Sequence, residues 1–180
     1  MWCWGRGLRG ALGTGDLTSE TCDGTRCSSR PLRVAGIDDA VSVSAGLHVA
    51  CARRRSEAAA CWGANNDGLV GDGTAKDRDG AVAVVGIRDV ATVHAGYLDS
   101  CAASTKGDAW CWGLGGRRAG FVPGPVPGLP SAVVALAGGW YHTCALLADG
   151  HVRCWGENQF GQLGDGTLAD HDDPRSPLGL

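Results

Sequence analysis

Short apolar runs alternate with polar residues along much of the chain, and each run ends at a glycine. The clearest example is Ala40–Ser44, where Ala, Val, Ser, Val and Ser follow one another with a period of two. This period is typical of a β-strand with one buried face. Comparable runs precede Gly46, Gly96 and Gly139, the last of them in a looser copy. The pattern therefore predicts short strands separated by glycine turns.

A hairpin is expected after each of these runs. It is clearest in residues 144–154, where Asp149 and Gly150 separate two apolar segments. Asp-Gly between apolar segments is a strong hairpin signal. Residues 50–60 are rich in alanine and arginine and have helical propensity, but they occupy the hairpin position of their unit. Because sequence register outweighs the propensity of one segment, we expect a hairpin there too.

The tripeptide Cys-Trp-Gly occurs four times, beginning at positions 3, 61, 111 and 154. Another cysteine stands ten residues before each of the last three copies. A unit that recurs about every 50 residues indicates an array of one supersecondary element. We expect one repeat array over residues 1–180, with units that start near 3, 61, 111 and 154, a partial last unit, and an insertion at 18–30.

The glycine content of the chain does not indicate disorder. The sequence has 30 glycines among 180 residues, but 44% of its residues are hydrophobic and seven are tryptophans. Turns that need a positive φ explain much of the glycine. A disordered chain has far fewer apolar and aromatic residues. We therefore expect a folded chain.

The fullest unit spans residues 139–167. It reads Gly-x-x-His-x-Cys-Ala-Leu, then Asp-Gly, then Cys-Trp-Gly-x-Asn-x-x-Gly-Gln-Leu-Gly-Asp-Gly-Thr. This pattern resembles the repeat of the regulator of chromosome condensation family. The unit around Asn65–Thr74 shares it well, the first unit shares it in part, and the third is degenerate. The cysteine-bearing form is similar to bacterial, often exported members.

The resemblance implies a β-propeller of four-stranded blades, usually seven in a ring. We expect an all-β chain of about three to four four-stranded antiparallel blades, as an incomplete ring or a fragment of a seven-bladed propeller. The array opens at Cys3, already inside a repeat. A fragment of a longer chain, or a misplaced gene start, accounts for this opening. Self-assembly of propeller arcs is the alternative.

Nine cysteines are a high number for this length, and six of them form three pairs at one spacing. Because metal sites rarely repeat with one pair per unit, the pattern favours disulfides within blades. Free cysteines that act as small core hydrophobes are the alternative. A direct pair across residues 144–154 needs a loop centred on Asp149, such as a three-residue turn with a bulge at Gly150. The expected pairs are Cys51–Cys61, Cys101–Cys111, Cys144–Cys154 and, inside the insertion, Cys22–Cys27.

Cysteine pairing also bears on the compartment. Disulfides favour an exported or cell-surface protein if the N-terminus is truncated, and the unpaired Cys3 agrees with such a truncation. The N-terminal residues lack the apolar core of a signal peptide, which favours the alternative of a cytoplasmic protein. No apolar stretch reaches the length that spans a membrane.

The tryptophans and the basic residues are the main candidates for contact with other groups. One tryptophan recurs per unit, and we expect these four to fill the space between blades: Trp4, Trp62, Trp112 and Trp155. Trp140 and Tyr141 stand outside that register beside two glycines, so we expect exposed contacts there. The runs Arg53, Arg54, Arg55 and Arg117, Arg118 are expected at a solvated hairpin tip and loop, where they can orient a partner.

Several function classes find no support in the sequence. The formal net charge is −3, so no overall nucleic-acid footprint is present. The five histidines stand at different places in their units and lack the spacing of metal ligands, so they do not indicate a metal site. Residues 72–83 fail as a calcium loop, because the sixth position is Asp77 and the twelfth is Ala83. No nucleophile elbow or phosphate-binding loop is present. We therefore expect no catalytic residues, no metal and no cofactor.

We expect a non-enzymatic scaffold that binds a protein partner through the loops between strands. The sequence does not identify this partner. The loops expected to contact it are 18–30, 53–59, 104–108 and 114–126. The alternative is guanine-nucleotide exchange on a small GTPase, as in the family namesake. A second alternative is a non-functional fragment of a longer propeller.

Overall fold

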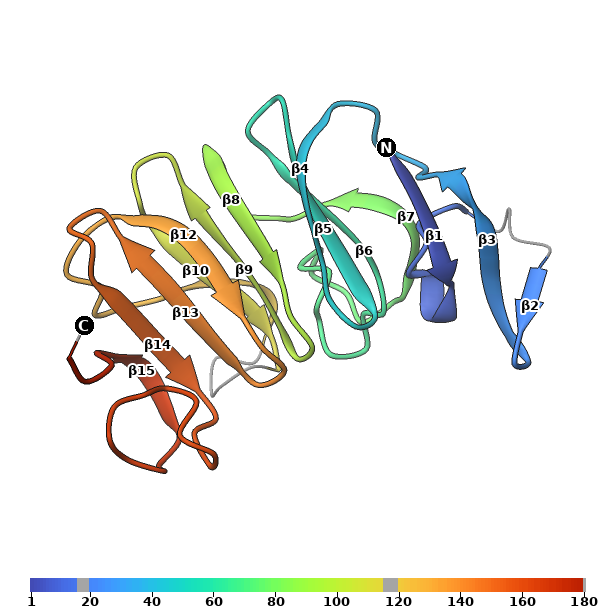
Figure 1. Cartoon of the computed structure of the whole chain (residues 1–180). Helices are drawn as coiled ribbons and strands as arrows, with labels where there is room; N and C mark the ends of the chain where they lie inside the picture. The colour runs from blue at the N-terminus through green and yellow to red at the C-terminus, as the bar shows by residue number, and fades with distance from the viewer. Residues whose placement is uncertain (16–19, 115–119, 180) are drawn as a thin grey trace.

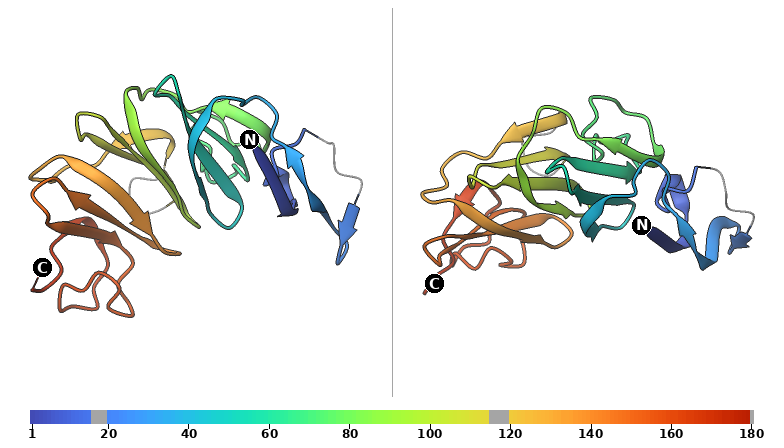
Figure 2. Two further views of the ribbon diagram at one scale, coloured as in Figure 1. Left: turned by 45° about the horizontal axis from the view of Figure 1, so that its top comes forward. Right: turned by 90° about the horizontal axis from the view of Figure 1, so that it is seen from above.

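The structure is a computed structural model of the 180-residue chain, and it describes residues 1–15, 20–114 and 120–179. Four antiparallel β-sheets follow one another along the chain and form an open arc (Figure 1, Figure 2). We number the sheets from the N-terminus, so the first is blue and the fourth is orange to red in Figure 1. The expected all-β fold of antiparallel blades is confirmed, and no α-helix occurs within the described ranges.

The first sheet has three strands in the order β1-β3-β2, and a short 3-10 turn, η1 (Leu8–Gly10), follows β1. Its strands are β1 (Trp2–Arg6), β2 (Glu20–Cys22) and β3 (Thr25–Arg33). At the tip between β2 and β3, Asp23 and Gly24 have φ angles of 48° and 72°. Two positive φ angles in succession are typical of the tight hairpin turns that Asp-Gly favours. Strands β2 and β3, which include the described part of the expected insertion, therefore form a hairpin in the first sheet.

The other three sheets share one design of four sequential antiparallel strands. The second sheet comprises β4 (Ala40–Ala45), β5 (Val49–Arg54), β6 (Ala59–Gly63) and β7 (Arg78–Ala83). The third sheet comprises β8 (Val90–Ala95), β9 (Asp99–Ser104), β10 (Ala109–Gly113) and β11 (Gly120–Pro125). The fourth sheet comprises β12 (Val133–Gly138), β13 (His142–Leu147), β14 (Val152–Gly156) and β15 (His171–Arg175). Residues 50–60 form strands and a hairpin, as the repeat register predicts. Strand β8 contacts both β4 and β12, so the first strands of these sheets lie side by side.

The hairpin between β13 and β14 has an odd loop, which sets two cysteines directly opposite each other. Cys144 faces Cys154 in the strand register, so the loop is centred on Asp149. Gly150 ends the loop with a φ of 86°. Glycine adopts this left-handed conformation without the steric cost that a β-carbon brings. The loop geometry required for a direct cysteine pair is therefore present.

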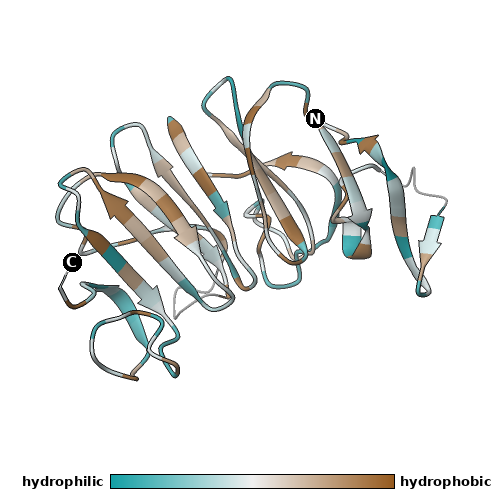
Figure 3. Ribbon diagram, viewed as in Figure 1, coloured by the Kyte–Doolittle hydropathy of each residue, from teal (hydrophilic) through white to brown (hydrophobic). Residues whose placement is uncertain are grey.

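Apolar clusters between neighbouring sheets make up the core. Each of the three clusters joins one sheet to the next along the arc. Between the second and third sheets, Cys51 and Cys61 pack in one cluster with Ala102 and Trp112. Apolar residues lie along the strands of these sheets in Figure 3, while the outermost strands β2 and β15 are mostly hydrophilic. Stacking of sheet on sheet therefore buries the apolar face that each sheet cannot bury alone.

Buried indoles lie over the glycine-rich turn of the preceding sheet. The Nε1 of Trp112 donates a hydrogen bond of 2.8 Å to the carbonyl oxygen of Leu69. A β-carbon on Gly71 would lie 2.7 Å from that nitrogen, so only glycine fits under the ring. Trp62 repeats this arrangement over Gly13, with a hydrogen bond of 3.2 Å to the turn. We call this contact between an indole and the preceding turn the indole joint.

Trp4 departs from this rule. It is 62% exposed, whereas Trp62 and Trp112 are 1% exposed and Trp155 is 5% exposed. The expectation that Trp4 fills a space between blades is wrong. The physical reason is that no glycine-rich turn from another sheet lies against Trp4 among the described residues.

Candidate functional site

The connecting loops gather on two opposite sides of the row of sheets, one at each end of the strands, because successive strands run in opposite directions. At one end, which we call the turn end, lie the two-residue turns at 47–48, 97–98 and 140–141 and the glycine-rich turns at 64–77 and 157–170. At the other end, the hairpin end, lie the loops at 55–58, 105–108 and 148–151. A candidate surface at either end thus draws its residues from several sheets.

Three aromatic side chains meet at the turn end. The ring centroids of Tyr97 and Trp140 are 5.8 Å apart, those of Tyr97 and Tyr141 are 5.4 Å apart, and those of Trp140 and Tyr141 are 6.3 Å apart. The two tyrosine rings meet edge to face, which is a favourable aromatic geometry. Trp140 is 70% exposed. We call these three residues the aromatic cluster, and it bridges the third and fourth sheets.

Tight turns hold the aromatic cluster in place. The backbone N–H of Gly96 donates to the carbonyl of Asp99 at 2.8 Å, and that of Gly139 donates to His142 at 3.0 Å. Each turn projects its two central residues from the end of a strand pair. The same turn in the second sheet carries Leu47, which is 58% exposed. The scaffold therefore presents a different side-chain pair at the same position in each sheet.

The phenol of Tyr141 stays protonated at neutral pH. Desolvation raises its pKa, and the neighbouring Tyr97 and the Glu157 carboxylate raise it further. The backbone N–H of Glu157 also donates to the Tyr141 carbonyl at 2.8 Å, which fixes the acidic residue beside the ring. A neutral phenol can donate a hydrogen bond to a ligand. The aromatic cluster thus combines apolar area with a donor and an adjacent negative charge.

Buried polar groups lie close in sequence to the residues of the aromatic cluster. The Thr143 hydroxyl donates a hydrogen bond of 2.5 Å to the carboxylate of Asp99, which is 6% exposed. His94 is 9% exposed, and its Nε2 has no hydrogen-bond partner among the described residues. Burial lowers the pKa of His94, Asp99 opposes that shift, and His142 adds to it. Among the described residues, no group of His, Cys, Asp and Glu side chains is arranged to hold a metal ion.

A buried asparagine organises each of the two glycine-rich turns at 64–77 and 157–170. Asn65 is 0% exposed, and its Oδ1 accepts a hydrogen bond of 2.9 Å from the Val70 N–H. Its Nδ2 donates to the Thr74 carbonyl at 2.9 Å. Asn158 makes the equivalent bonds with the fourth sheet's turn. The carboxylates that faintly suggested a calcium loop are part of this arrangement, since Asp72 accepts from Asn65 at 3.1 Å.

The basic residues expected at the hairpin end mostly hold the structure together. The Nε of Arg53 donates to the Val90 carbonyl at 2.6 Å and so links the second and third sheets. The Nε of Arg54 donates to the Asp39 carboxylate at 2.7 Å. Arg55 is exposed. Arg117 and Arg118 lie outside the described residues, as do residues 115–119 of the expected loop 114–126 and residues 18–19 of the insertion loop.

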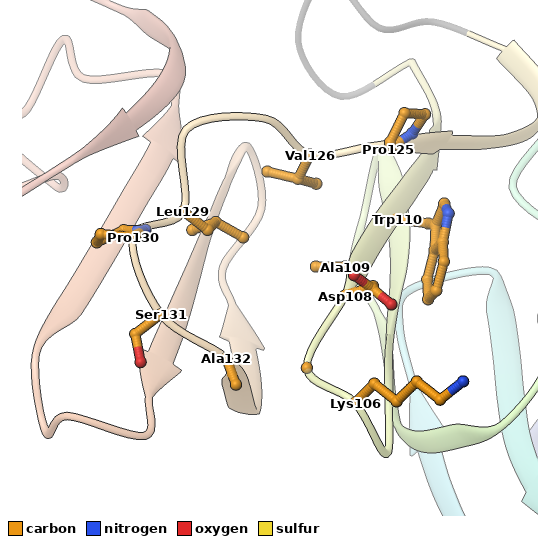
Figure 4. Close-up of a pocket in the computed structure, with 11 residues that line it drawn as sticks. Lys106, Asp108, Ala109, Trp110, Pro125, Val126, Leu129, Pro130, Ser131 and Ala132 are labelled. Carbon is orange, nitrogen blue, oxygen red and sulfur yellow. The ribbon is translucent and has the colours of Figure 1, made fainter.

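A cleft of about 390 Å³ lies at the hairpin end, between the third sheet and the linker to the fourth. Two of the expected contact loops line it, through Lys106 and Val126 among others. Figure 4 shows Leu129 pointing from the linker toward Ala109, with Trp110 on the other side of the same strand. The structure thus brings loop 104–108 together with Pro125 and Val126 at the hairpin end, whereas the aromatic cluster lies at the turn end.

The cysteines lie in pairs at disulfide distance. The S–S distances are 1.98 Å for Cys22–Cys27, 2.14 Å for Cys51–Cys61, 2.12 Å for Cys101–Cys111 and 2.07 Å for Cys144–Cys154. Each of the last three pairs joins neighbouring strands of one sheet, with Cα atoms 4.1 Å apart. Cys3 has no cysteine partner among the described residues, and partial burial raises the pKa of its thiol.

Sequence reasoning identified Trp140 and Tyr141 but missed Tyr97, His94 and Asp99. Tyr97 directly follows the repeated Gly96, just as Trp140 follows Gly139. This shared offset is the signal that could have found it. The buried pair Asp99 and Thr143 leaves no such signal, because its partners belong to different units and have no common offset.

Comparisons with known proteins agree with the repeat. The family model of the regulator of chromosome condensation (RCC1) repeat matches residues 133–162. The ultraviolet-B receptor UVR8 of Arabidopsis thaliana is 46% identical over 44 residues, which are 24% of this chain and 10% of that protein. Probable E3 ubiquitin-protein ligase HERC4 of Homo sapiens is 51% identical over 35 residues, which are 19% of this chain and 3% of that protein.

The solved structures extend the likeness over nearly the whole chain. Prp20p of Saccharomyces cerevisiae overlays with a TM-score of 0.80 at 25% identity, covering 99% of this chain and 47% of that one. The chain therefore spans less than half the length of the relatives it matches. Among the described residues no helix is both long and apolar enough to cross a membrane. The bacterial type implied by the cysteines stays a prediction. The matched repeat, the sheet design and the overlay together identify this chain as one that carries the RCC1 repeat and has the fold of a row of RCC1-type β-propeller blades.

Proposed function

We propose that this chain is a non-enzymatic scaffold that binds a protein partner through the aromatic cluster at the turn end. The supporting observation is Trp140, whose side chain is 70% exposed on a turn fixed by the backbone hydrogen bond between Gly139 and His142. Exposed, rigidly held aromatic side chains give a large contact area at low cost in conformational entropy. They are also enriched among the residues that dominate binding energy.

The neighbourhood of the cluster adds to this support. Leu47 occupies the equivalent turn of the second sheet and is also exposed, so apolar side chains recur along the turn end. The Glu157 carboxylate lies beside Tyr141 and raises the pKa of its phenol. A partner segment with an apolar anchor and a neighbouring basic group complements this surface, because charge complementarity across an interface favours association.

Affinity capture with matched variants tests this function. The chain is immobilised as wild type, as Trp140→Ala, and as the control Phe160→Ala, which removes an aromatic ring that is 91% exposed outside the cluster. We expect wild type and Phe160→Ala to retain the same proteins from an extract and Trp140→Ala to lose them. Each retained protein is then purified, and its dissociation constant is measured directly. Equal binding by Trp140→Ala and wild type contradicts the proposal.

A second candidate is guanine-nucleotide exchange on a small GTPase. The observation that favours it is the overlay with Prp20p, whose structure was reported with its binding properties to Gsp1p and histones. The experiment measures release of a fluorescent guanine nucleotide from a panel of purified small GTPases. Accelerated release at substoichiometric amounts of this chain would establish exchange in place of a scaffold role. An unchanged rate for every GTPase would contradict exchange, and the affinity capture then remains the test of the scaffold role.

A further inference from the structure

Half of an indole joint is exposed at the first sheet. Trp4 lies in β1 and is followed by Gly5 with a φ of 101°, close to the 110° of Gly63 and the 100° of Gly113 after the buried indoles. The preceding residue, Cys3, packs against the core cluster shared with the second sheet. Because successive side chains in a strand point to opposite faces, Trp4 points away from the second sheet. The indole is thus presented as in the complete joints, with 62% of its surface exposed.

The other half of the joint is exposed at the fourth sheet. The turn at 157–170 is built like the turn at 64–77, since Asn158 accepts from Leu163 at 2.9 Å as Asn65 does from Val70. Gly164 has a φ of 66°, the same value as Gly13 under Trp62. A β-carbon on Gly164 would meet only Pro177, at 3.4 Å, and no indole lies over it among the described residues.

The atom that would accept the indole hydrogen bond can also be named. In the two hydrogen-bonded joints, the accepting carbonyl belongs to the residue two positions before the glycine, Ala11 before Gly13 and Leu69 before Gly71. The equivalent residue of the fourth sheet is Gln162. The open face of that sheet also carries the pair Cys144–Cys154, and the equivalent pair Cys51–Cys61 packs in one cluster with Trp112.

We infer that two copies of this chain associate head to tail, with Trp4 of one copy seated on the Gly164 turn of the other. The indole Nε1 donates to the Gln162 carbonyl oxygen, and the ring covers Gly164. The contact is heterologous, because it uses different surfaces on the two copies. It uses neither the aromatic cluster nor its turns, so it is independent of the proposed scaffold function.

A second copy fits these surfaces because the chain already makes the same contact with itself. Trp62 and Trp112 each bind the turn of the preceding unit, so the sequence encodes both parts of the joint in a mutually compatible form. The four sheets form an open arc, so within one copy the first and fourth sheets do not meet (Figure 1). Head-to-tail contact continues the arc in the same direction.

Sedimentation of the 180-residue chain tests the inference. We expect a mass that rises with concentration above the 18.4 kDa of one copy. Trp4→Ala and Gly164→Asn should each weaken association by at least about tenfold, because each removes a central contact of the interface. Asparagine tolerates the left-handed conformation at position 164, so the turn can persist. The matched controls are Trp140→Ala and Gly150→Asn, since Gly150 has a φ of 86° and open space around its β-carbon position.

Mixing the two variants distinguishes head-to-tail association from every symmetric contact. Trp4→Ala keeps an intact turn, and Gly164→Asn keeps an intact indole. Each variant alone should sediment as a monomer, while an equimolar mixture should form a dimer with one copy of each. A wild-type chain that stays monomeric, association that survives Trp4→Ala, or a mixture that stays monomeric would each overturn the inference. Trp4 is exposed, so its removal is expected to leave the circular dichroism spectrum unchanged.

Discussion

The carboxylate of Asp99 and the hydroxyl of Thr143 are joined by a hydrogen bond of 2.5 Å across the boundary between the third and fourth sheets. Both residues are buried, and each lies two positions after a tyrosine of the aromatic cluster. Asp99 follows the turn that carries Tyr97, and Thr143 follows the turn that carries Trp140. This bond therefore fixes the relative positions of the two turns from which the exposed rings project.

Thr143→Val should destabilise the protein while preserving the shape of the side chain. The change removes the donor and leaves a buried carboxylate with one partner fewer, which costs about 1–3 kcal/mol. Urea denaturation measures the loss in free energy of unfolding. Thr105→Val is the control, because Thr105 is exposed. Equal stabilities of the two variants would show that the Asp99 bond contributes nothing across the sheets.

Stability should fall on acidification through the titration of His94. Burial holds its folded-state pKa below the ordinary value of 6.5, against the opposing effect of Asp99 and with a smaller contribution from His142. The unfolded chain therefore binds the proton more readily, and acid favours unfolding. The His94 contribution is complete above the ordinary pKa and is lost as the pH falls through the folded-state value.

Comparison of variants isolates this effect from other titrating groups. His94→Gln should show a smaller fall in free energy of unfolding between about pH 7 and pH 5 than wild type, because the group that takes up the proton is gone. Gln159→Ala, which replaces an exposed side chain that does not titrate, should follow the wild-type curve. If the curve for His94→Gln matches wild type over this range, burial of His94 is not the cause of the acid sensitivity.

Mass spectrometry should find four disulfides and one thiol. The structure pairs eight of the nine cysteines and leaves Cys3 without a cysteine partner among its described residues. Reduction of the unfolded chain should add about two hydrogens for each bridge. An unreduced chain that reacts with alkylating reagent at all nine cysteines is the contrary result, and it would favour free cysteines in the core.

Removal of one bridge should have a measurable cost. The double variant Cys101→Ala, Cys111→Ala opens a short loop in the third sheet and should lower the free energy of unfolding by roughly 2.5–3 kcal/mol in the chain-entropy model. Replacement of Cys3 by alanine is the control, since this residue closes no loop in the structure. Denaturation in the absence of reductant measures both. A double variant as stable as the control would rule out this bridge as a source of stability.

Asn65→Ala should destabilise the glycine-rich turn of the second sheet. The variant leaves the buried Val70 N–H without its asparagine partner, at about 1–3 kcal/mol, and also removes the bond to the partly buried Thr74 carbonyl. Hydrogen exchange at the Val70 amide should speed up together with the loss in global stability. Asn66→Ala, at an exposed neighbouring position, provides the matched control. Unchanged exchange at Val70 would contradict the role assigned to Asn65.

Repetition in the sequence made most of the fold predictable. Hydrophobic alternation placed a strand at Ala40–Ser44, and β4 covers Ala40–Ala45. The fixed cysteine spacing required a loop centred on Asp149, and the register of β13 and β14 has that centre. Both features are local, because strand alternation and hairpin register depend on residues close together in the chain.

The candidate surface was predictable only in part, because its residues come from different sheets. Trp140 stood out as an aromatic beside two glycines, but its partner Tyr97 belongs to the preceding unit. The arginines of the β5–β6 hairpin were predicted to lie at a solvated tip, whereas the Arg53 side chain donates a hydrogen bond to the Val90 carbonyl of the next sheet. Such contacts depend on how one sheet stacks on another, which no local pattern specifies.

The sequence by itself determined the repeating unit, its strands and the register that sets its cysteines opposite one another, because these follow from short-range periodicity. Only the tertiary structure decided which of the four equivalent tryptophans are buried and which is exposed. Trp62 and Trp112 share a local sequence with Trp4, yet they are buried and Trp4 is exposed. The reason is that an indole is buried here by the glycine-rich turn of a neighbouring sheet, so its environment depends on what stacks against it rather than on its own strand.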